Sequence, residues 1–281
     1  MNCKNCNTIL SEENRFCNQC GAKVIQHRLS FKSLLVELKE NVFNLDANRP
    51  LQTFIDLFVR PEAVIGGYIQ GVRKKYLNPF GYFTLAITLF GLFLFFFSEE
   101  YANAMAGVSS TIDQDASQLE ITQKISEFVM KYQSFIFFLF VPLLAFISKL
   151  VFLKNKKFNY VEHLIINTYG QAHISLFSTL LYFCTVWFQD IFNYISLSVT
   201  ILYILYFAYI LKRLFQLSFL QIVLKTLLFF VIFLPFYLLL SVLLWVFLVV
   251  SGQVDLQEMM EAQKAKQSVS YIASSFRNWT S

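Results

Sequence analysis

The stretch PFGYFTLAITLFGLFLFFF, from Pro79 to Phe97, decides the fold. It carries no charge, and its length is close to the run of about 20 apolar residues that an α-helix needs to cross a bilayer. Pro79 suits the first helical turn, where its missing amide proton is not needed. The whole chain is similar, since 56% of its 281 residues are hydrophobic and only 15% are charged. Soluble domains carry roughly 25% charged residues, so a bilayer is the natural solvent for this chain.

Four more apolar runs are long enough to cross the bilayer. With the first, they predict an all-α polytopic membrane protein of about five transmembrane helices. We expect residues 98–134 to form a polar loop and residues 251–281 a polar C-terminal tail. The turn between the third and fourth runs is very short, so a re-entrant pair is an alternative to a spanning hairpin. The expected transmembrane domain, residues 79–250, comprises spans 79–97, 135–153, 164–188, 191–211 and 222–250.

Two shorter apolar segments precede these spans. Leu29 to Phe43 and Leu51 to Val59 repeat apolar residues at helical spacing, and Arg60-Pro61 ends the second segment. Both are too short to span the membrane and too apolar to stand free in water. We therefore expect residues 29–78 to form cytoplasmic or interfacial amphipathic helices. Helices of a small soluble domain are the alternative.

Positive charges lie mainly on one side of the expected spans. Under the positive-inside rule, this places the N-terminus in the cytoplasm and the C-terminus outside. The cluster before the first span, Arg73, Lys74 and Lys75, is also a candidate for contacts with anionic headgroups or another anionic ligand. Between the later spans, the basic residues on that side are Lys154, Lys156, Lys157, Lys212 and Arg213, with Lys225 just inside the fifth span.

Four cysteines form a C-x2-C-x10-C-x2-C pattern in the first residues of the chain. Two such knuckles can bring four thiolates to the corners of a tetrahedron, so we predict a zinc ribbon over residues 1–22. The ligands would be Cys3, Cys6, Cys17 and Cys20. A site of four thiolates is closed, so Zn²⁺ would be structural. The ribbon would then contact a cytoplasmic protein or simply cap the chain. Its few charges make no basic surface, and we expect no nucleic-acid partner.

The third span is unusually polar. Glu162, Tyr169 and His173 recur at helical spacing on one face, so the helix has a polar side over about three turns. One hypothesis is a polar cavity, proton path or metal site within the membrane. The other is that these side chains join helices or bind at the interface. The candidate intramembrane polar site comprises Glu162, His163, Asn167, Tyr169, Gln171 and His173.

The order of these parts resembles a family of uncharacterised bacterial membrane proteins, domain of unknown function number 3667, frequent in Bacteroidetes. The resemblance rests on the cysteine pattern with Phe16 and Gly21, on Arg60-Pro61 through Pro79, and on Tyr160-x-Glu162-His163-Leu. It implies a bacterial inner-membrane protein with a zinc ribbon, and it implies no catalytic residue.

The sequence is consistent with three functions. The first is a non-enzymatic docking or assembly component of the membrane, with the bilayer and a cytoplasmic protein as partners. The second is a transporter or permease-like protein that uses the polar face of the third span. The third is an intramembrane enzyme, although the sequence contains no nucleophile elbow, H-E-x-x-H pattern or dinucleotide fingerprint.

Overall fold

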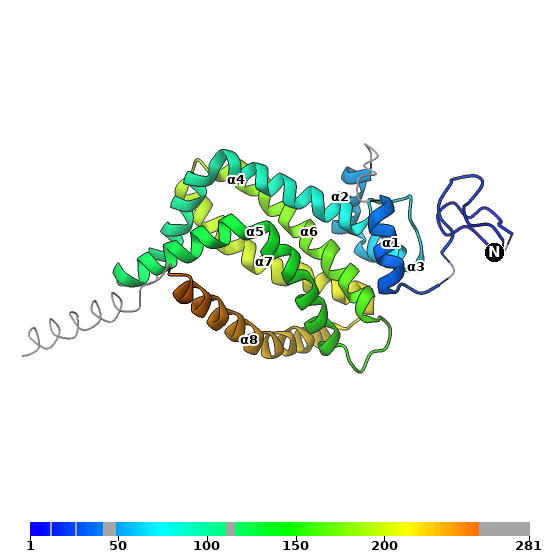
Figure 1. Ribbon diagram of the computed structural model, residues 1–281. Coiled ribbons are helices and arrows are strands. Elements are labelled where there is room, and N and C mark those ends of the chain that lie inside the picture. Colours follow the sequence, from blue (N-terminus) through cyan, green and yellow to red (C-terminus); the bar gives the residue numbers. More distant parts are fainter. Residues whose placement is uncertain (12, 26, 42–48, 111–115, 253–281) are drawn as a thin grey trace, which may run out of the picture. The chain divides into compact units, whose positions relative to one another are not determined.

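A computed structural model describes residues 1–11, 13–25, 27–41, 49–110 and 116–252 (Figure 1). Within these ranges the chain is mostly helical, and pairing between extended segments is limited to two isolated bridges near the N-terminus. The all-α membrane class is therefore confirmed. The helices are α1 (Phe31–Asn41), α2 (Arg49–Val59), a π-helical segment η1 (Glu62–Gly66), α3 (Gly67–Gln70), α4 (Pro79–Ser110), α5 (Ala116–Val151), α6 (Tyr160–Thr185), α7 (Gln189–Phe215) and α8 (Phe219–Val250).

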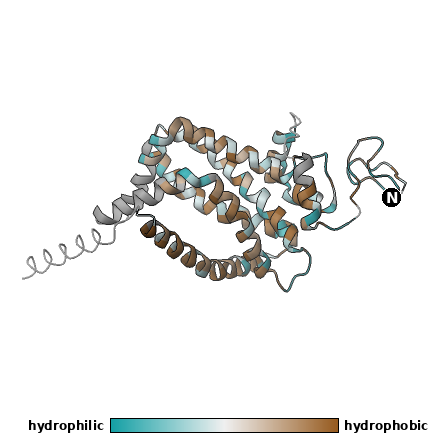
Figure 2. Ribbon diagram, in the orientation of Figure 1, coloured by the Kyte–Doolittle hydropathy of each residue, from teal (hydrophilic) through white to brown (hydrophobic). Residues whose placement is uncertain are grey.

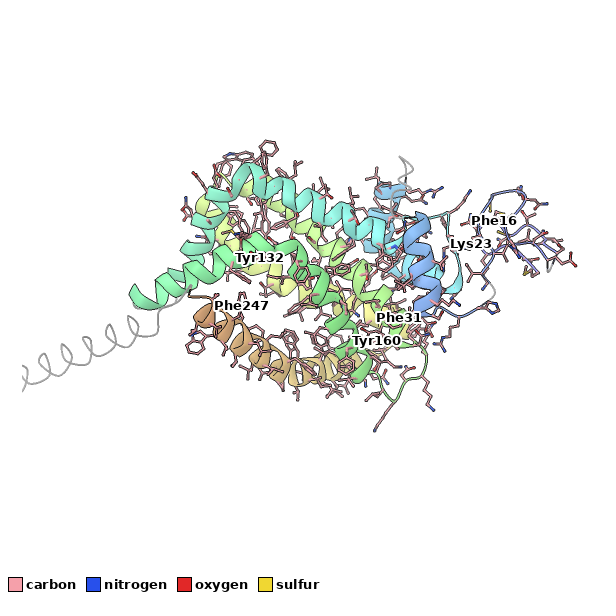
Figure 3. All side chains as sticks on the ribbon, in the orientation of Figure 1. Phe16, Lys23, Phe31, Tyr132, Tyr160 and Phe247 are labelled. Carbon is pink, nitrogen blue, oxygen red and sulfur yellow. The ribbon has the colours of Figure 1, made fainter. Side chains whose placement is uncertain are left out.

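The chain divides into two compact units. Unit 1 contains Met1–Ala104 and Ser134–Ile232, and unit 2 contains Met105–Gln133 and Phe233–Ser281. Unit 1 holds the cysteine cluster and a buried core to which α2, α4, α5, α6 and α7 contribute. Within unit 2, the Phe128 ring packs against Tyr132 and Phe247, with centroid distances of 4.7 and 5.8 Å (Figure 3).

Among the residues that the structure describes, three helices are long and apolar enough to cross a membrane. They cover Pro79–Asn103, Asp190–Phe215 and Phe219–Phe247, and Phe135–Val151 is a shorter apolar helix. Helix α8 is hydrophobic along its whole length (Figure 2). Helix α6, the third expected span, is not among these candidates, because its first half is rich in polar side chains. The expected number of about five spans thus stays a prediction.

The expected polar loop over residues 98–134 is wrong for the part that the structure describes. Helix α4 continues to Ser110, and α5 begins at Ala116. Phe97, where the first apolar run ends, has non-helical angles (φ −129°, ψ 30°) inside α4. The change in composition therefore marks a kink rather than the end of a helix. The expected tail over residues 251–281 lies almost wholly outside the described residues.

Helix α6 is the central helix of unit 1. Every side chain from Val161 to Ile174 is buried, so this part of the helix is covered on all sides. Gly170 allows α7 to approach closely, since a Cβ at this position would lie 2.8 Å from the Phe207 ring. The polar half of α6 is thus surrounded by protein rather than by lipid.

Asn159 starts α6 with a capping box. Its side chain accepts a hydrogen bond from the Glu162 amide, and the Glu162 carboxylate accepts one from the Asn159 amide. Two lysines bind carbonyls near helix C-termini: Lys157 Nζ donates to Leu214 O and Lys225 Nζ donates to Val151 O, both at 2.6 Å. Cations are favourable there, because these carbonyls lack helical partners. Lys149 Nζ donates to Phe158 O, in the segment before α6, at 2.7 Å.

Helix α2 has an unusual distribution of side chains. Thr53, Asp56 and Leu57 are buried, whereas Leu51 and Ile55 are exposed. Thr53 Oγ1 accepts a hydrogen bond from the Leu77 amide at 2.9 Å, so the polar side of α2 holds the segment that enters α4.

Candidate functional site

The four predicted ligands lie together. The sulfurs of Cys3, Cys6, Cys17 and Cys20 are all within 4.8 Å of one another, so the four residues can hold a metal ion. The Cys3 and Cys20 sulfurs are 3.7 Å apart, and those of Cys6 and Cys17 are 3.6 Å apart. In the part of the chain whose side chains are described, this is the one such group of cysteine, histidine and acidic residues.

Two similar backbone turns build the cluster. In the first, the Asn7 amide donates to Cys3 O, and in the second the Gly21 amide donates to Cys17 O, both at 2.8 Å. Asn7 and Gly21 each follow the second cysteine of a knuckle and have φ of 62°. Asparagine and glycine are the residues that adopt this left-handed conformation most readily. The local sequence therefore repeats the same turn twice.

An antiparallel bridge closes each turn. The first joins Asn2 and Ile9, and the second joins Phe16 and Lys23, which Figure 3 labels. Leu10 packs with the buried Cys3 and Cys17 into a small cluster separate from the main core.

The thiols differ in acidity. A hydrogen bond with the Thr8 hydroxyl is the main reason that the pKa of Cys6 is lowered to about 6. Burial raises the pKa of Cys20 to about 11. All four would be thiolates in a metal complex, because the metal displaces their protons.

The ribbon contacts the segment between α3 and α4. Lys4 Nζ donates to Gln70 O at 2.7 Å, and the Lys74 amide donates to Asn5 Oδ1 at 3.1 Å. Gly71, with φ of 108°, lies under the ribbon, since a Cβ here would meet Ile25 at 3.1 Å. The left-handed backbone at Gly71 is thus part of this contact.

In the basic cluster before α4, Arg73 packs against the protein, whereas Lys74 and Lys75 are exposed. The Arg73 guanidinium lies 4.1 Å from the centroid of the Tyr68 ring and donates to Tyr68 O. Lys74 Nζ would lie 2.9 Å from a Cβ on Gly21, so its ammonium group is beside the second knuckle. Lys75 Nζ lies 5.4 Å from the Tyr76 ring centroid.

Glu162 is buried at the N-terminus of α6. Arg28 Nε and Nη2 donate to its two oxygens at 2.8 and 2.6 Å, and Nη2 also donates to Lys157 O. Asn159 Nδ2 donates to Leu29 O at 3.0 Å. Phe31 stacks on Tyr160 with a centroid distance of 5.7 Å (Figure 3). These contacts tie the segment after the ribbon to α6.

The two histidines of α6 occupy separate sites. His163 Nδ1 lies 2.9 Å from Ser148 Oγ, and His173 Nδ1 lies 2.8 Å from Tyr82 Oη. Both rings are fully buried. Three turns of helix separate the two rings, so the structure does not bring them together as one ligand set.

The other predicted polar residues also have partners. Asn167 Nδ2 donates to His163 O at 2.8 Å, within α6 itself. Tyr169 Oη donates to Leu77 O at 2.7 Å, and Tyr203 Oη donates to Gln171 Oε1. The contacts therefore join α6 to α7 and to the start of α4. Two atoms are exceptions, since Nε2 of His163 and Nε2 of His173 have no hydrogen-bond partner in the described part of the chain.

The sequence interpretation missed the partners Arg28, Ser148 and Tyr82. It also missed Phe54 and Phe58 of α2, whose rings lie 4.9 and 4.2 Å from the His173 ring centroid. The apolar spacing of α2 was visible in the sequence, but nothing in it connected that helix with His173.

The fold and the cluster define an all-α membrane protein with an N-terminal four-cysteine cluster. Residues 48–91 match the model of the family described as "Protein of unknown function (DUF3667)". The family model thus matches one part of the chain, in agreement with that part of the resemblance. The matched range includes α2, α3 and the start of α4, and thus Phe54, Phe58 and Tyr82 around His173. Comparison with curated proteins and with solved structures gives no match.

Proposed function

We propose that this protein is a non-enzymatic docking or assembly component of a bacterial inner membrane, built on a structural zinc ribbon in the cytoplasm. The observation that carries the proposal is the four-sulfur cluster on a ribbon that is fixed to the helices. Contacts from Lys4, Asn5 and Arg28 connect the ribbon and its linker to two segments of unit 1.

Zinc is the metal that suits the cluster best. In a tetrahedral site with Zn–S bonds of about 2.3 Å, neighbouring sulfurs lie about 3.8 Å apart. The distances of 3.7 and 3.6 Å agree with this geometry. With four thiolates the coordination sphere is complete, so the metal would stabilise the ribbon and would not activate water.

The contacts of α6 favour a structural role for its polar face. Glu162 is paired with Arg28, and Gln171 with Tyr203. A transport path needs polar groups that face water or a cargo, whereas these groups are buried against other parts of the protein. The alternative, a transporter or permease-like protein, is favoured by the two imidazole Nε2 atoms without a partner.

The proposed orientation follows from charge and from redox chemistry. The basic residues near α3, α5 and α7 would lie in the cytoplasm by the positive-inside rule. The four thiols would lie on the same, reducing side, which keeps them available for metal.

Site-specific photo-crosslinking in cells tests the docking function. A benzophenone amino acid replaces the exposed Phe16 of the ribbon, and a matched control replaces the exposed Phe138 of α5. We expect a defined protein adduct from position 16 that disappears when Cys17→Ser removes a metal ligand. An adduct that persists without the metal ligand, or no adduct at position 16, would contradict docking through the ribbon.

A further inference from the structure

Helix α2 places polar side chains inward and apolar side chains outward. Thr53 and Asp56 are 0% and 7% exposed, whereas Leu51, Ile55 and Val59 are 66%, 52% and 63% exposed. A helix on the surface of a water-soluble domain has the opposite arrangement. The exposed side of α2 therefore suits an apolar medium.

The exposed apolar residues form a regular face. Leu51, Ile55 and Val59 follow the spacing i, i+4 and i+8, which places them on one side of a helix. We call these three residues the outer face of α2. Its opposite side, Thr53, Asp56 and Leu57, is buried in unit 1.

The C-terminal carbonyls of α2 have partners that do not depend on water. Tyr206 Oη donates to Leu57 O at 3.2 Å, and Tyr209 Oη donates to Val59 O at 3.1 Å. The last carbonyls of a helix otherwise need water or a cap. An unpaired carbonyl is unfavourable in hydrocarbon, so hydroxyl groups at this place suit a helix end beside lipid.

The outer face continues onto α7. Tyr209 contacts Val59, and the exposed Leu205 and Ile201 precede Tyr209 in α7 at intervals of four residues. These residues belong to Asp190–Phe215, one of the helices long and apolar enough to cross a membrane. The apolar surface of α2 thus joins the lipid-facing side of a candidate span.

The ends of α2 are positively charged. Arg49 begins the helix and Arg60 follows its last residue, with the Arg60 side chain half exposed while it pairs with Asp56. A helix with an apolar face and arginines at both ends matches the boundary between acyl chains and anionic headgroups.

We infer that the outer face of α2 contacts lipid acyl chains, with Arg49 and Arg60 at headgroup level. The helix is an in-plane membrane helix rather than a docking surface for another protein. Only the choice of the cytoplasmic leaflet rests on the proposed function, because lipid contact itself does not depend on orientation.

Fluorescence quenching in vesicles tests the inference. Trp187, Trp245 and Trp279 are replaced by Phe, and Ile55→Trp introduces a single reporter in the full-length protein. The variant is reconstituted in phosphatidylcholine and phosphatidylglycerol vesicles that contain dibrominated phosphatidylcholine. We expect brominated lipid to remove most of the fluorescence and aqueous iodide to have little effect.

Two controls calibrate the result. Ile9→Trp in the same background reports on the ribbon, where Ile9 is 82% exposed, and should be quenched by iodide. A variant that retains only Trp245, an exposed residue of the apolar helix Phe219–Phe247, gives the signal of a tryptophan on a candidate membrane helix. Folding of each variant is checked by circular dichroism and gel filtration, and Leu51→Trp replaces Ile55→Trp if the latter does not fold.

Two outcomes would overturn the inference. Quenching by iodide alone would show that the outer face of α2 meets water. Quenching by neither agent would show that protein covers it, whether a second copy of the chain or another partner. Brominated lipid is present in both leaflets, so an inverted topology would leave the expected quenching intact. Failure of the docking proposal would instead appear in the crosslinking at position 16.

Discussion

The Arg28–Glu162 pair joins the linker after the ribbon to the first turn of α6. Glu162 has two functions here, because its carboxylate binds Arg28 and completes the capping box with Asn159. Its side chain is 3% exposed, whereas that of Arg28 is 54% exposed. Solvent therefore weakens the ion pair. Breaking it should cost less free energy of unfolding than breaking a fully buried pair.

Substitution of Glu162 separates these two contributions. Glu162→Ala removes both, and we expect a loss of about 2 kcal/mol in the free energy of unfolding. Glu162→Gln keeps a side chain that can complete the capping box, so its loss should be smaller. Unfolding by SDS in mixed micelles measures both variants. A double-mutant cycle with Arg28→Ala is the control, and equal losses for Ala and Gln would contradict the two-part role.

Asp56 makes stability depend on pH. Its hydrogen bonds with Arg60, at 2.9 and 3.1 Å, hold the pKa of the carboxyl below its usual value. A lowered pKa in the folded state stabilises the protein above the unfolded pKa of about 3.9, and this stabilisation is lost as the pH falls through the folded pKa.

The thermal midpoint of Asp56→Asn should therefore be lower than that of the unmodified protein at neutral pH, by an amount that changes little between pH 8 and pH 5. Below about pH 4 the difference should shrink, because the carboxyl of the unfolded chain becomes protonated there, and it should be lost as the pH falls through the lower pKa of the folded state. Thermal unfolding in detergent at a series of pH values measures this. A difference independent of pH down to pH 3 would show that the ion pair has no role.

At the scale of helices, the contact between α6 and α7 depends on Gly170. A Cβ there would meet two atoms of the Phe207 ring at 2.8 and 2.9 Å. We expect Gly170→Ala to destabilise the protein by about 1–3 kcal/mol, as overpacking does. Gly91→Ala is the matched control, because nothing lies within 4 Å of its Cβ position.

SDS unfolding compares the two alanine variants. If steric conflict is the cause, Phe207→Leu should restore part of the stability lost in Gly170→Ala. Equal stability of Gly170→Ala and Gly91→Ala would show that the helices can separate at no cost.

The helical segments were largely predictable, because apolar runs have a direct physical cause. The run over residues 222–250 ends at Val250, as α8 does, and Leu51 to Val59 lies within α2. The extension of α4 beyond Phe97 was not predictable from hydropathy, since polar residues form helices equally well. The composition of a segment indicates whether it faces lipid or water, but it indicates less reliably where a helix ends.

The cysteine cluster was predictable because its ligands are close in sequence. The surroundings of α6 were not, because Arg28, Ser148 and Tyr82 come from three distant segments. Spacing placed Glu162, Tyr169 and His173 on one polar face, but Val161 to Ile174 are buried on every face. A helix that is polar on one side suggested a cavity. Because protein encloses α6 on all sides, its polar side chains find partners in several directions instead.

For the molecule as a whole, the ribbon should unfold independently of the helices. Its small buried cluster is separate from the main core, and the metal supplies the folding free energy that so few residues cannot. Purified protein should contain about one zinc per chain. Removal by a chelator should increase cleavage by trypsin near Arg15 and Lys23 while leaving the far-ultraviolet circular dichroism almost unchanged.

Elemental analysis and limited proteolysis measure the effect of zinc. Cys17→Ser should show the same cleavage without chelator, and Cys184→Ser, outside the cluster, should behave as the unmodified protein. Reduced protein without bound metal would contradict the zinc assignment, and a large loss of helix would contradict the independence of the ribbon.

The topology of the chain is also testable. An odd number of spans with a cytoplasmic N-terminus places the C-terminus outside. A reporter fused after Ser281 should therefore be active as alkaline phosphatase and inactive as green fluorescent protein. The opposite pattern would show an even number of crossings, with α6 as the first helix to re-examine because it is not among the apolar candidates.

Lys157 and Lys225 contribute to the charge asymmetry of the chain and also connect neighbouring helices. Each ammonium group lies 2.6 Å from a backbone carbonyl near the end of another helix, Leu214 and Val151 respectively. With the proposed orientation, the same cations that resist translocation during insertion later fasten neighbouring helices together. The same lysines thus affect both the insertion of the chain into the membrane and the packing of its helices. In a chain inserted with the opposite orientation, these lysine–carbonyl contacts would lie on the other side of the membrane.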